Sequence, residues 1–105
     1  MTERALKKQI KQDLLDQLDR NGTHGDYYRD LVEDYMTLWE TKNALTKDIG
    51  ARGVVVEYTS NTGQINMKKN ESVGELLKVN AQMTKLLDAL GITPAQVIGD
   101  DDDEM

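Results

Sequence analysis

The chain has 105 residues and a mass of 11.8 kDa, which is the size of one domain. It has 38% hydrophobic residues, no Phe and one Trp, so any core must be small. The net charge is −6, but the run Asp100–Glu104 holds five negative charges and the rest of the chain is close to neutral. This excludes an acidic disordered polymer and a uniformly basic nucleic-acid binder. The absence of Cys excludes a disulfide scaffold, a Cys-based zinc site and a thiol nucleophile.

The sequence contains no recognisable secretion signal, membrane span or catalytic motif. The first ten residues are charged and amphipathic, and the longest run of large apolar residues is Val54–Val56. The single histidine, His24, lies in a Gly-rich loop without an obvious partner. We therefore expect a soluble intracellular protein with no membrane contact, metal, cofactor or catalytic residue.

Two helices are predicted in the N-terminal half of the chain. Apolar spacing predicts the first over residues 3–20, with Thr2 as its cap. A loop of Asn and Gly residues follows. The second helix is expected over residues 27–49, with Asp26 as its cap and Gly50 as its end.

A β-hairpin and a third helix are predicted in the C-terminal half. Two short strands, 54–58 and 64–67, flank a polar turn that contains Asn and Gly. The third helix is expected over 71–90 with Gly91 after it, and Thr93–Pro94 should begin a short helical turn. The predicted fold is mainly α: a short N-terminal helix, then two long antiparallel helices joined by a β-hairpin.

The apolar faces of the two long helices are wide. On a helical wheel each covers about half the circumference, whereas a stripe of about 100° is enough to pack against one neighbour. Either the first helix and the hairpin cover the surplus, or copies of the chain bury it between them, because large exposed apolar patches are uncommon on monomers. We expect self-association into a closed homo-oligomer. The residues expected at the interface are Tyr35, Trp39, Leu76, Leu77, Met83 and Leu87.

Four cations share one face of the first helix. Arg4, Lys7, Lys8 and Lys11 are spaced i, i+3, i+4, i+7, while the later acids of this helix lie on its other side. The cations could neutralise DNA phosphates, or they could form an ordinary solvated helix surface. A helix-turn-helix with the second long segment as its recognition helix is disfavoured, because that helix presents mostly acids outward.

Residues 99–105 are predicted to form a disordered acidic tail, because five adjacent like charges repel one another. Loose calcium binding is the weaker alternative, since the run lacks the Gly turn and the distant Glu of an EF-hand loop. Residues 1–98 are then expected to form a single helical domain for DNA binding and oligomerisation.

The order of elements, together with one motif, resembles the small subunit of phage terminase. The segment Leu90-Gly91-Ile92-Thr93-Pro94 is similar to the Leu-Gly-Leu-Thr-Pro that ends the last helix in one branch of this family. The resemblance covers about residues 14–97. The residues that match the middle section of the family are Tyr28, Leu31, Val32, Tyr35, Gly50 and Gly53.

This resemblance implies a non-catalytic role without a cofactor. Small terminase subunits assemble into rings, recognise viral double-stranded DNA and deliver it to the large subunit, which holds the ATPase and the nuclease. The implied partners are viral DNA, the large subunit and other copies of the chain, in the cytoplasm of the infected bacterium. The alternative is a helical scaffold or adaptor that binds only other proteins, and an enzyme is a more distant third.

Overall fold

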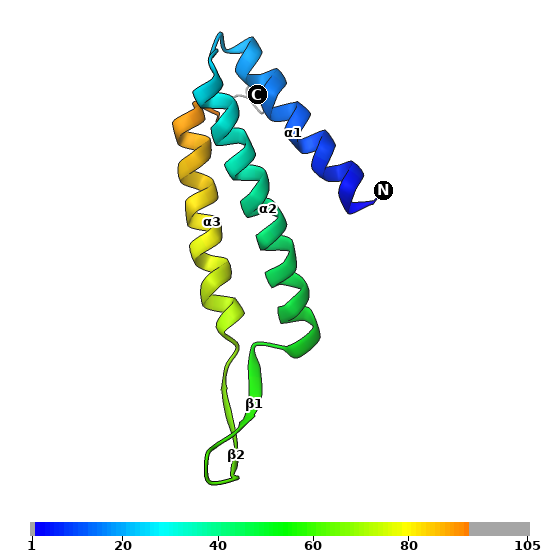
Figure 1. The fold of residues 1–105 in the computed structure, drawn as a ribbon, viewed down its shortest axis with the longest axis vertical. Coiled ribbons are helices and arrows are strands. Elements are labelled where there is room, and N and C mark those ends of the chain that lie inside the picture. The colour runs from blue at the N-terminus through cyan, green and yellow to red at the C-terminus, as the bar shows by residue number, and fades with distance from the viewer. Residues whose placement is uncertain (1, 93–105) are drawn as a thin grey trace, which may run out of the picture.

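A computed structural model describes residues 2–92 of the chain. The elements in chain order are α1 (Glu3–Arg20), α2 (Asp26–Arg52), β1 (Val55–Thr59), β2 (Ile65–Lys69) and α3 (Glu71–Leu90). The helices α2 and α3 lie side by side and antiparallel, and the hairpin extends beyond their shared end (Figure 1). The predicted arrangement of three helices and a hairpin is therefore confirmed for these residues. The expected turn at Thr93–Pro94 and the acidic tail 99–105 lie outside the described residues.

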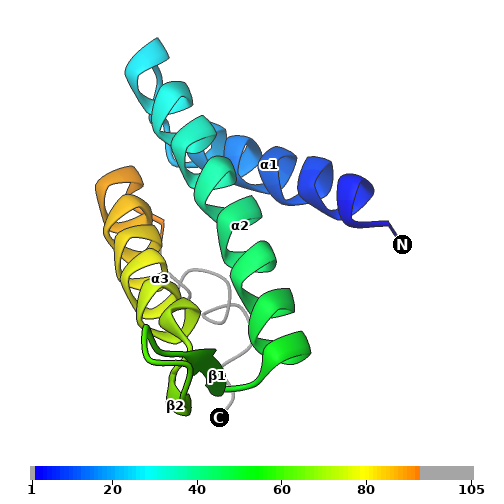
Figure 2. The same ribbon diagram turned by 60° about the horizontal axis from the view of Figure 1, so that its bottom comes forward.

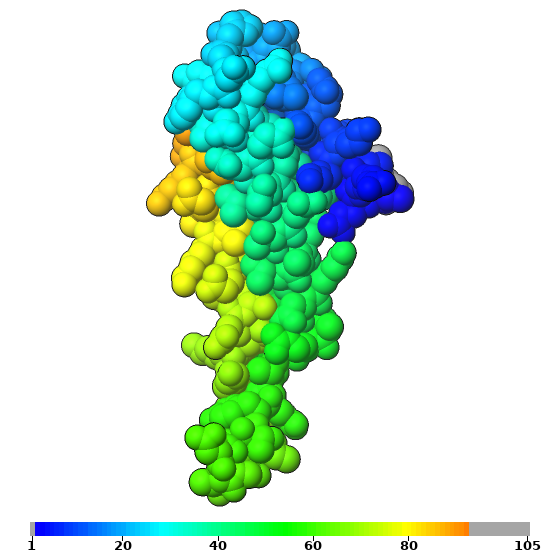
Figure 3. Space-filling model, in the orientation of Figure 1, coloured from blue at the N-terminus to red at the C-terminus, as the bar shows by residue number. Residues whose placement is uncertain are grey.

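The molecule is elongated, and its core is correspondingly thin. Its extents are 61 × 38 × 27 Å, and its radius of gyration of 18.6 Å exceeds the value of about 13 Å expected for a compact domain of this length. Figure 3 shows the hairpin as a narrow projection from the helical body. The main hydrophobic cluster lies where the three helices meet; its buried members are Leu14, Leu18, Val32, Met36, Trp39, Met83 and Leu90.

Helix α1 packs on α2 through its C-terminal half. Thr2 caps its start, since the Thr2 hydroxyl accepts a hydrogen bond of 3.0 Å from the Ala5 amide. Leu14 and Leu18 are buried, whereas Leu6 near the start is 40% exposed. The axes of α1 and α2 accordingly diverge from the loop that joins them toward the N-terminus (Figure 2).

Helix α2 begins one residue earlier and ends three residues later than predicted. Gly25 stands at the N-cap position without a side-chain bond, and Asp26 is the first helical residue, where its charge favours the helix dipole. The helix runs through Gly50 and ends at Gly53, whose φ of +86° suits glycine. Gly50 is tolerated because helix-interior glycine costs only about 1 kcal/mol, and the following turn is reinforced by ion pairing of Arg52 with Asp48.

The hairpin strands begin one residue later than predicted, and β2 also extends further, to Lys69. The strands are antiparallel, with Val55 opposite Lys69 at the base and Thr59 opposite Ile65 beside the turn. Because residues directly opposite share a face, one face of the hairpin carries Val55, Glu57, Thr59, Ile65, Met67 and Lys69. The opposite face carries Val56, Tyr58, Asn66 and Lys68.

Helix α3 has the predicted bounds. Its N-cap is Asn70, whose side chain accepts a hydrogen bond from the Ser72 amide, and Gly91 ends it in the left-handed region with a φ of +73°. Both signals act within a few residues, which is why the sequence predicts this helix correctly.

Candidate nucleic-acid interface

The four cations predicted to contact DNA gather around one surface depression. Arg4, Lys7, Lys8 and Lys11 line it together with Glu33 of α2, and its volume is about 410 Å³. The shared face predicted from helical spacing is therefore present in the structure. The depression lies where α1 diverges from α2, which leaves the cations reachable from solvent.

Two of these four cations are engaged by acids of α2. The Lys7 ammonium lies 2.9 Å from a Glu40 carboxylate oxygen, and Lys11 forms an ion pair with Glu33. Glu3, beside the same face, accepts hydrogen bonds from Lys47 at 2.8 Å and from Asn43 at 3.4 Å, and these bonds lower the pKa of its carboxyl. The N-terminal half of α1 is thus tied to α2 by charged side chains instead of apolar packing.

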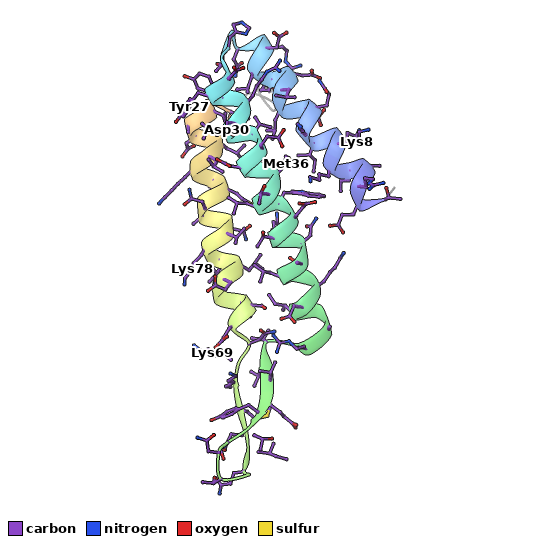
Figure 4. All side chains as sticks on the ribbon, in the orientation of Figure 1. Lys8, Tyr27, Asp30, Met36, Lys69 and Lys78 are labelled. Carbon is purple, nitrogen blue, oxygen red and sulfur yellow. The ribbon has the colours of Figure 1, made fainter. Side chains whose placement is uncertain are left out.

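Arg4 and Lys8 are the more available pair. Both are exposed, and between residues 2 and 92 the structure gives neither an ion pair. Lys8 projects from α1 into open space (Figure 4). An incoming phosphate would meet these two charges before displacing Glu33 or Glu40 from the other two.

The sequence does not reveal the pairing of α1 with Glu33 and Glu40. Helical periodicity places both acids on the charged side of α2, and such a side is predicted to face solvent. Their seven-residue separation keeps them on one face, and this is the only local signal. Which cations they meet depends on the angle between α1 and α2, and that angle is a tertiary property.

A second polar cluster was missed because its members are far apart in sequence. The Asn70 side chain is 1% exposed. Its amide nitrogen donates to the Gly53 carbonyl at 2.9 Å and to Asp48 at 3.1 Å, and its oxygen accepts from Arg52 at 3.1 Å. Ser72 also donates to Asp48, at 2.7 Å. This network joins the end of α2, the base of the hairpin and the start of α3.

The network predicts a dependence of stability on pH. Hydrogen bonds from Arg52, Ser72 and Asn70 hold the pKa of Asp48 well below its ordinary value of 3.8. A depressed carboxyl pKa contributes stability that is present above the unfolded-state pKa and is lost as the pH falls toward the folded-state pKa. We expect the free energy of unfolding to decline below about pH 5.

The Asp48→Asn variant should be less stable at pH 7 and show a shallower decline toward acid. Glu3 titrates in the same direction, so part of the decline should persist. Urea unfolding followed by circular dichroism at several pH values, at one protein concentration, measures both slopes. Equal slopes for the two proteins would show that Asp48 does not contribute to the acid sensitivity.

The six residues predicted at the interface between copies fall into two groups. Trp39 and Met83 are buried inside the single chain, at 7% and 5% exposure, because α1 and α3 both pack on α2. Leu77, by contrast, is 67% exposed. The remaining three, Tyr35, Leu76 and Leu87, are half-buried, and burial raises the pKa of the Tyr35 hydroxyl. The part these residues play in assembly stays a prediction.

Other kinds of site were sought in the same part of the chain. No helix within residues 2–92 is both long and apolar enough to cross a membrane. Nor do these residues bring together three or more His, Asp or Glu side chains that could hold a metal ion. His24 is exposed in the loop between α1 and α2.

One comparison with known proteins finds a match, and that match covers most of the chain. A family model described as phage terminase, small subunit, matches residues 8–97. A search of curated proteins and a search of solved structures gave no significant match. The family match spans most of the chain. It includes α2, α3, the hairpin and all of α1 except its first five residues, and it agrees with the resemblance noted in the sequence. The chain belongs to the family of phage terminase small subunits.

Proposed function

We propose that this chain is the small subunit of a viral DNA-packaging terminase, which binds phage DNA as an oligomeric ring and delivers it to the large ATPase and nuclease subunit. Family membership supports a role in phage DNA packaging. The observation that carries DNA binding is the gathering of Arg4, Lys7, Lys8 and Lys11 around one depression. Cations at a surface are sufficient to bind phosphates without reading base sequence.

The proposed role is non-catalytic and needs no cofactor, and its place is the cytoplasm of the infected bacterium. A ring would strengthen DNA binding because it repeats the cation face of α1 once in every subunit. Each subunit offers only a few cations, but every copy presents the same face, so weak phosphate contacts add along the duplex. The exposed apolar side chains of the hairpin and of α3 support assembly, since patches of this kind are commonly buried between chains.

The adaptor function remains the second candidate, because the ion pairs of Lys7 and Lys11 withdraw charge from the DNA face. Three measurements separate the two. The proposed function predicts a multi-subunit mass in light scattering, retention of duplex DNA at low salt and co-purification with a large ATPase subunit. An oligomer that retains no DNA at low salt would favour the adaptor.

Removing the acids that compete for the cations should strengthen DNA binding. We expect Glu33→Gln with Glu40→Gln to raise the affinity severalfold at low salt, because Lys7 and Lys11 then become available to phosphates. The matched control is Asp30→Asn with Asp34→Asn, which removes two charges from exposed positions of the same helix. Equal gains in the two variants would show that only overall charge matters and that the ion pairs do not restrain the cations.

A further inference from the structure

The N-terminal half of α1, residues 3–11, lies across an open gap from α2, and we call it the arm. In the described part of α1, no residue before Ile10 packs on the hydrophobic cluster, and Leu6 is 40% exposed. A depression of about 330 Å³ opens between the arm and α2, and it is lined by Glu3, Arg4, Lys7, Trp39 and Glu40. Apolar packing therefore contributes little to the position of the arm.

Three ion pairs join the arm to α2, and all three lie at the surface. They are Lys7 with Glu40, Lys11 with Glu33 and Lys47 with Glu3. The side chains that α2 supplies to these pairs are 54%, 56% and 72% exposed. Exposed ion pairs contribute little to stability and are screened by salt. The arm is thus held weakly, whereas the C-terminal half of α1 is held by the burial of Leu14 and Leu18.

The short loop after α1 provides a place where the arm can pivot. The Thr23 amide still donates to the Leu18 carbonyl of α1 at 2.9 Å, so only His24 and Gly25 separate it from the first residue of α2. Gly25 has a φ of +121°, which glycine adopts readily. Leu18 lies close to this link, whereas Glu3 lies about 22 Å further along the helix at 1.5 Å per residue. A small rotation at the link therefore moves the arm by several ångströms and moves the buried leucines little.

Duplex DNA is able to compete with α2 for the cations of the arm. DNA carries about one negative charge for every 1.7 Å of its axis, whereas Glu33 and Glu40 carry one charge each. Asp30 and Asp34 are also exposed on α2, so this helix repels the phosphates that the arm attracts. DNA bound to the arm is attracted by one helix and repelled by the next, which favours a wider angle between them.

We infer that the arm has a closed and an open position. In the free chain the ion pairs with α2 hold it closed, and a phosphate backbone opens it by taking Lys7 and Lys11 from Glu40 and Glu33. This rests on the DNA binding proposed above and adds how the cation face is regulated. The closed arm masks two of its four cations, so the complete face is presented only when closely spaced phosphates are present.

The distance between two spin labels measures the position of the arm. The chain has no Cys, so Ala5→Cys and Ala44→Cys place one label on the arm and one on α2, both at exposed positions. Labelled chains are diluted into unlabelled chains, so that only distances within one chain are measured. Compared with the free chain at low salt, saturating duplex DNA should lengthen the distance by about 5 Å or more. NaCl at about 0.5 M should lengthen it without DNA, because salt screens the ion pairs.

A reference pair and two sets of substitutions sharpen this measurement. Labels at Ala44→Cys and Ala81→Cys join α2 to α3, which lie side by side, and their distance should not change (Figure 1). The variant that removes all three ion pairs is Glu33→Gln, Glu40→Gln and Lys47→Gln. The control with the same change of charge, at positions that form no ion pair within residues 2–92, is Asp30→Asn, Asp34→Asn and Lys42→Gln.

The first variant should show the open distance at low salt without DNA, and the control should stay closed. Helicity in circular dichroism should be the same in both, because the arm moves as a helix. A loss of helicity in the first variant would mean that the arm unfolds, which contradicts a pivot. A first variant that stays closed would show that the ion pairs do not hold the arm.

The response to DNA separates this inference from the proposed function. If wild type binds duplex DNA and the distance keeps its closed value, opening of the arm is wrong and the DNA-binding function stands. If wild type binds no DNA even at low salt, the DNA-binding function fails and opening by DNA fails with it.

Discussion

Replacing Arg4 and Lys8 with glutamine should lower the affinity for duplex DNA by about tenfold or more at low salt. These two cations lie on the face of α1 that also carries Lys7 and Lys11. Neither forms an ion pair with any residue in the described part of the chain. Each lost phosphate contact should also reduce the slope of log affinity against log salt by about one unit. The loss should be the same for every DNA sequence, because backbone contacts carry no sequence information. Binding measured at three salt concentrations gives both quantities.

Two further double variants locate the DNA surface. Lys7→Gln with Lys11→Gln should lose less affinity than the first pair, because Glu40 and Glu33 already neutralise part of that charge. Lys68→Gln with Lys69→Gln removes the same charge from the hairpin and should leave DNA binding nearly unchanged. A loss confined to the hairpin pair would move the DNA surface to the hairpin. Unchanged binding in all three would leave the adaptor as the better function.

Replacing Asn70 with alanine should destabilise the protein by about 2–4 kcal/mol. The change removes the N-cap of α3 and leaves the Gly53 carbonyl without its side-chain donor. It also removes the partner that Arg52 and Asp48 share, at a position that is 1% exposed. Buried polar groups left unsatisfied cost more than an average hydrogen bond contributes. Urea unfolding at fixed protein concentration measures the difference.

The matched control for this substitution is Asn66→Ala, the same change at an exposed position of β2. We expect it to alter stability by no more than about 0.5 kcal/mol. If the two variants were equally stable, the buried network around Asn70 would make no measurable contribution to the free energy of unfolding. A destabilised Asn70→Ala protein should also assemble poorly, because this network holds the base of the hairpin against both long helices.

Local signals were sufficient to predict most of the fold. The Thr2 cap, the polar turn of the hairpin and the left-handed Gly91 all act within four residues, and the elements they bound were placed correctly or within two residues. The end of α2 was the exception. Gly50 was predicted as the stop, but of the two nearby glycines only Gly53 adopts positive φ, because the chain must turn there to enter β1.

The candidate DNA-binding face was also predicted only in part from the sequence. Four cations on one face of α1 follow from the 3.6-residue period alone, and the structure gathers them as that period requires. Their engagement by Glu33 and Glu40 does not follow from it, because an ion pair between two helices depends on how those helices cross. The burial of Asn70 is also non-local, since its partners come from the end of α2 and the loop after it.

By itself the sequence determined the helices, the hairpin, the cation face and the family, because each depends on spacing or short motifs within a continuous segment. Only the tertiary structure decided which apolar residues remain for a partner. The helical wheel treats Trp39, Met83 and Leu77 alike, yet packing of α1 and α3 on α2 buries the first two and leaves Leu77 exposed beside the hairpin. Periodicity specifies which side of a helix is apolar, whereas the neighbours that cover it are set by the three-dimensional arrangement of segments far apart in the chain.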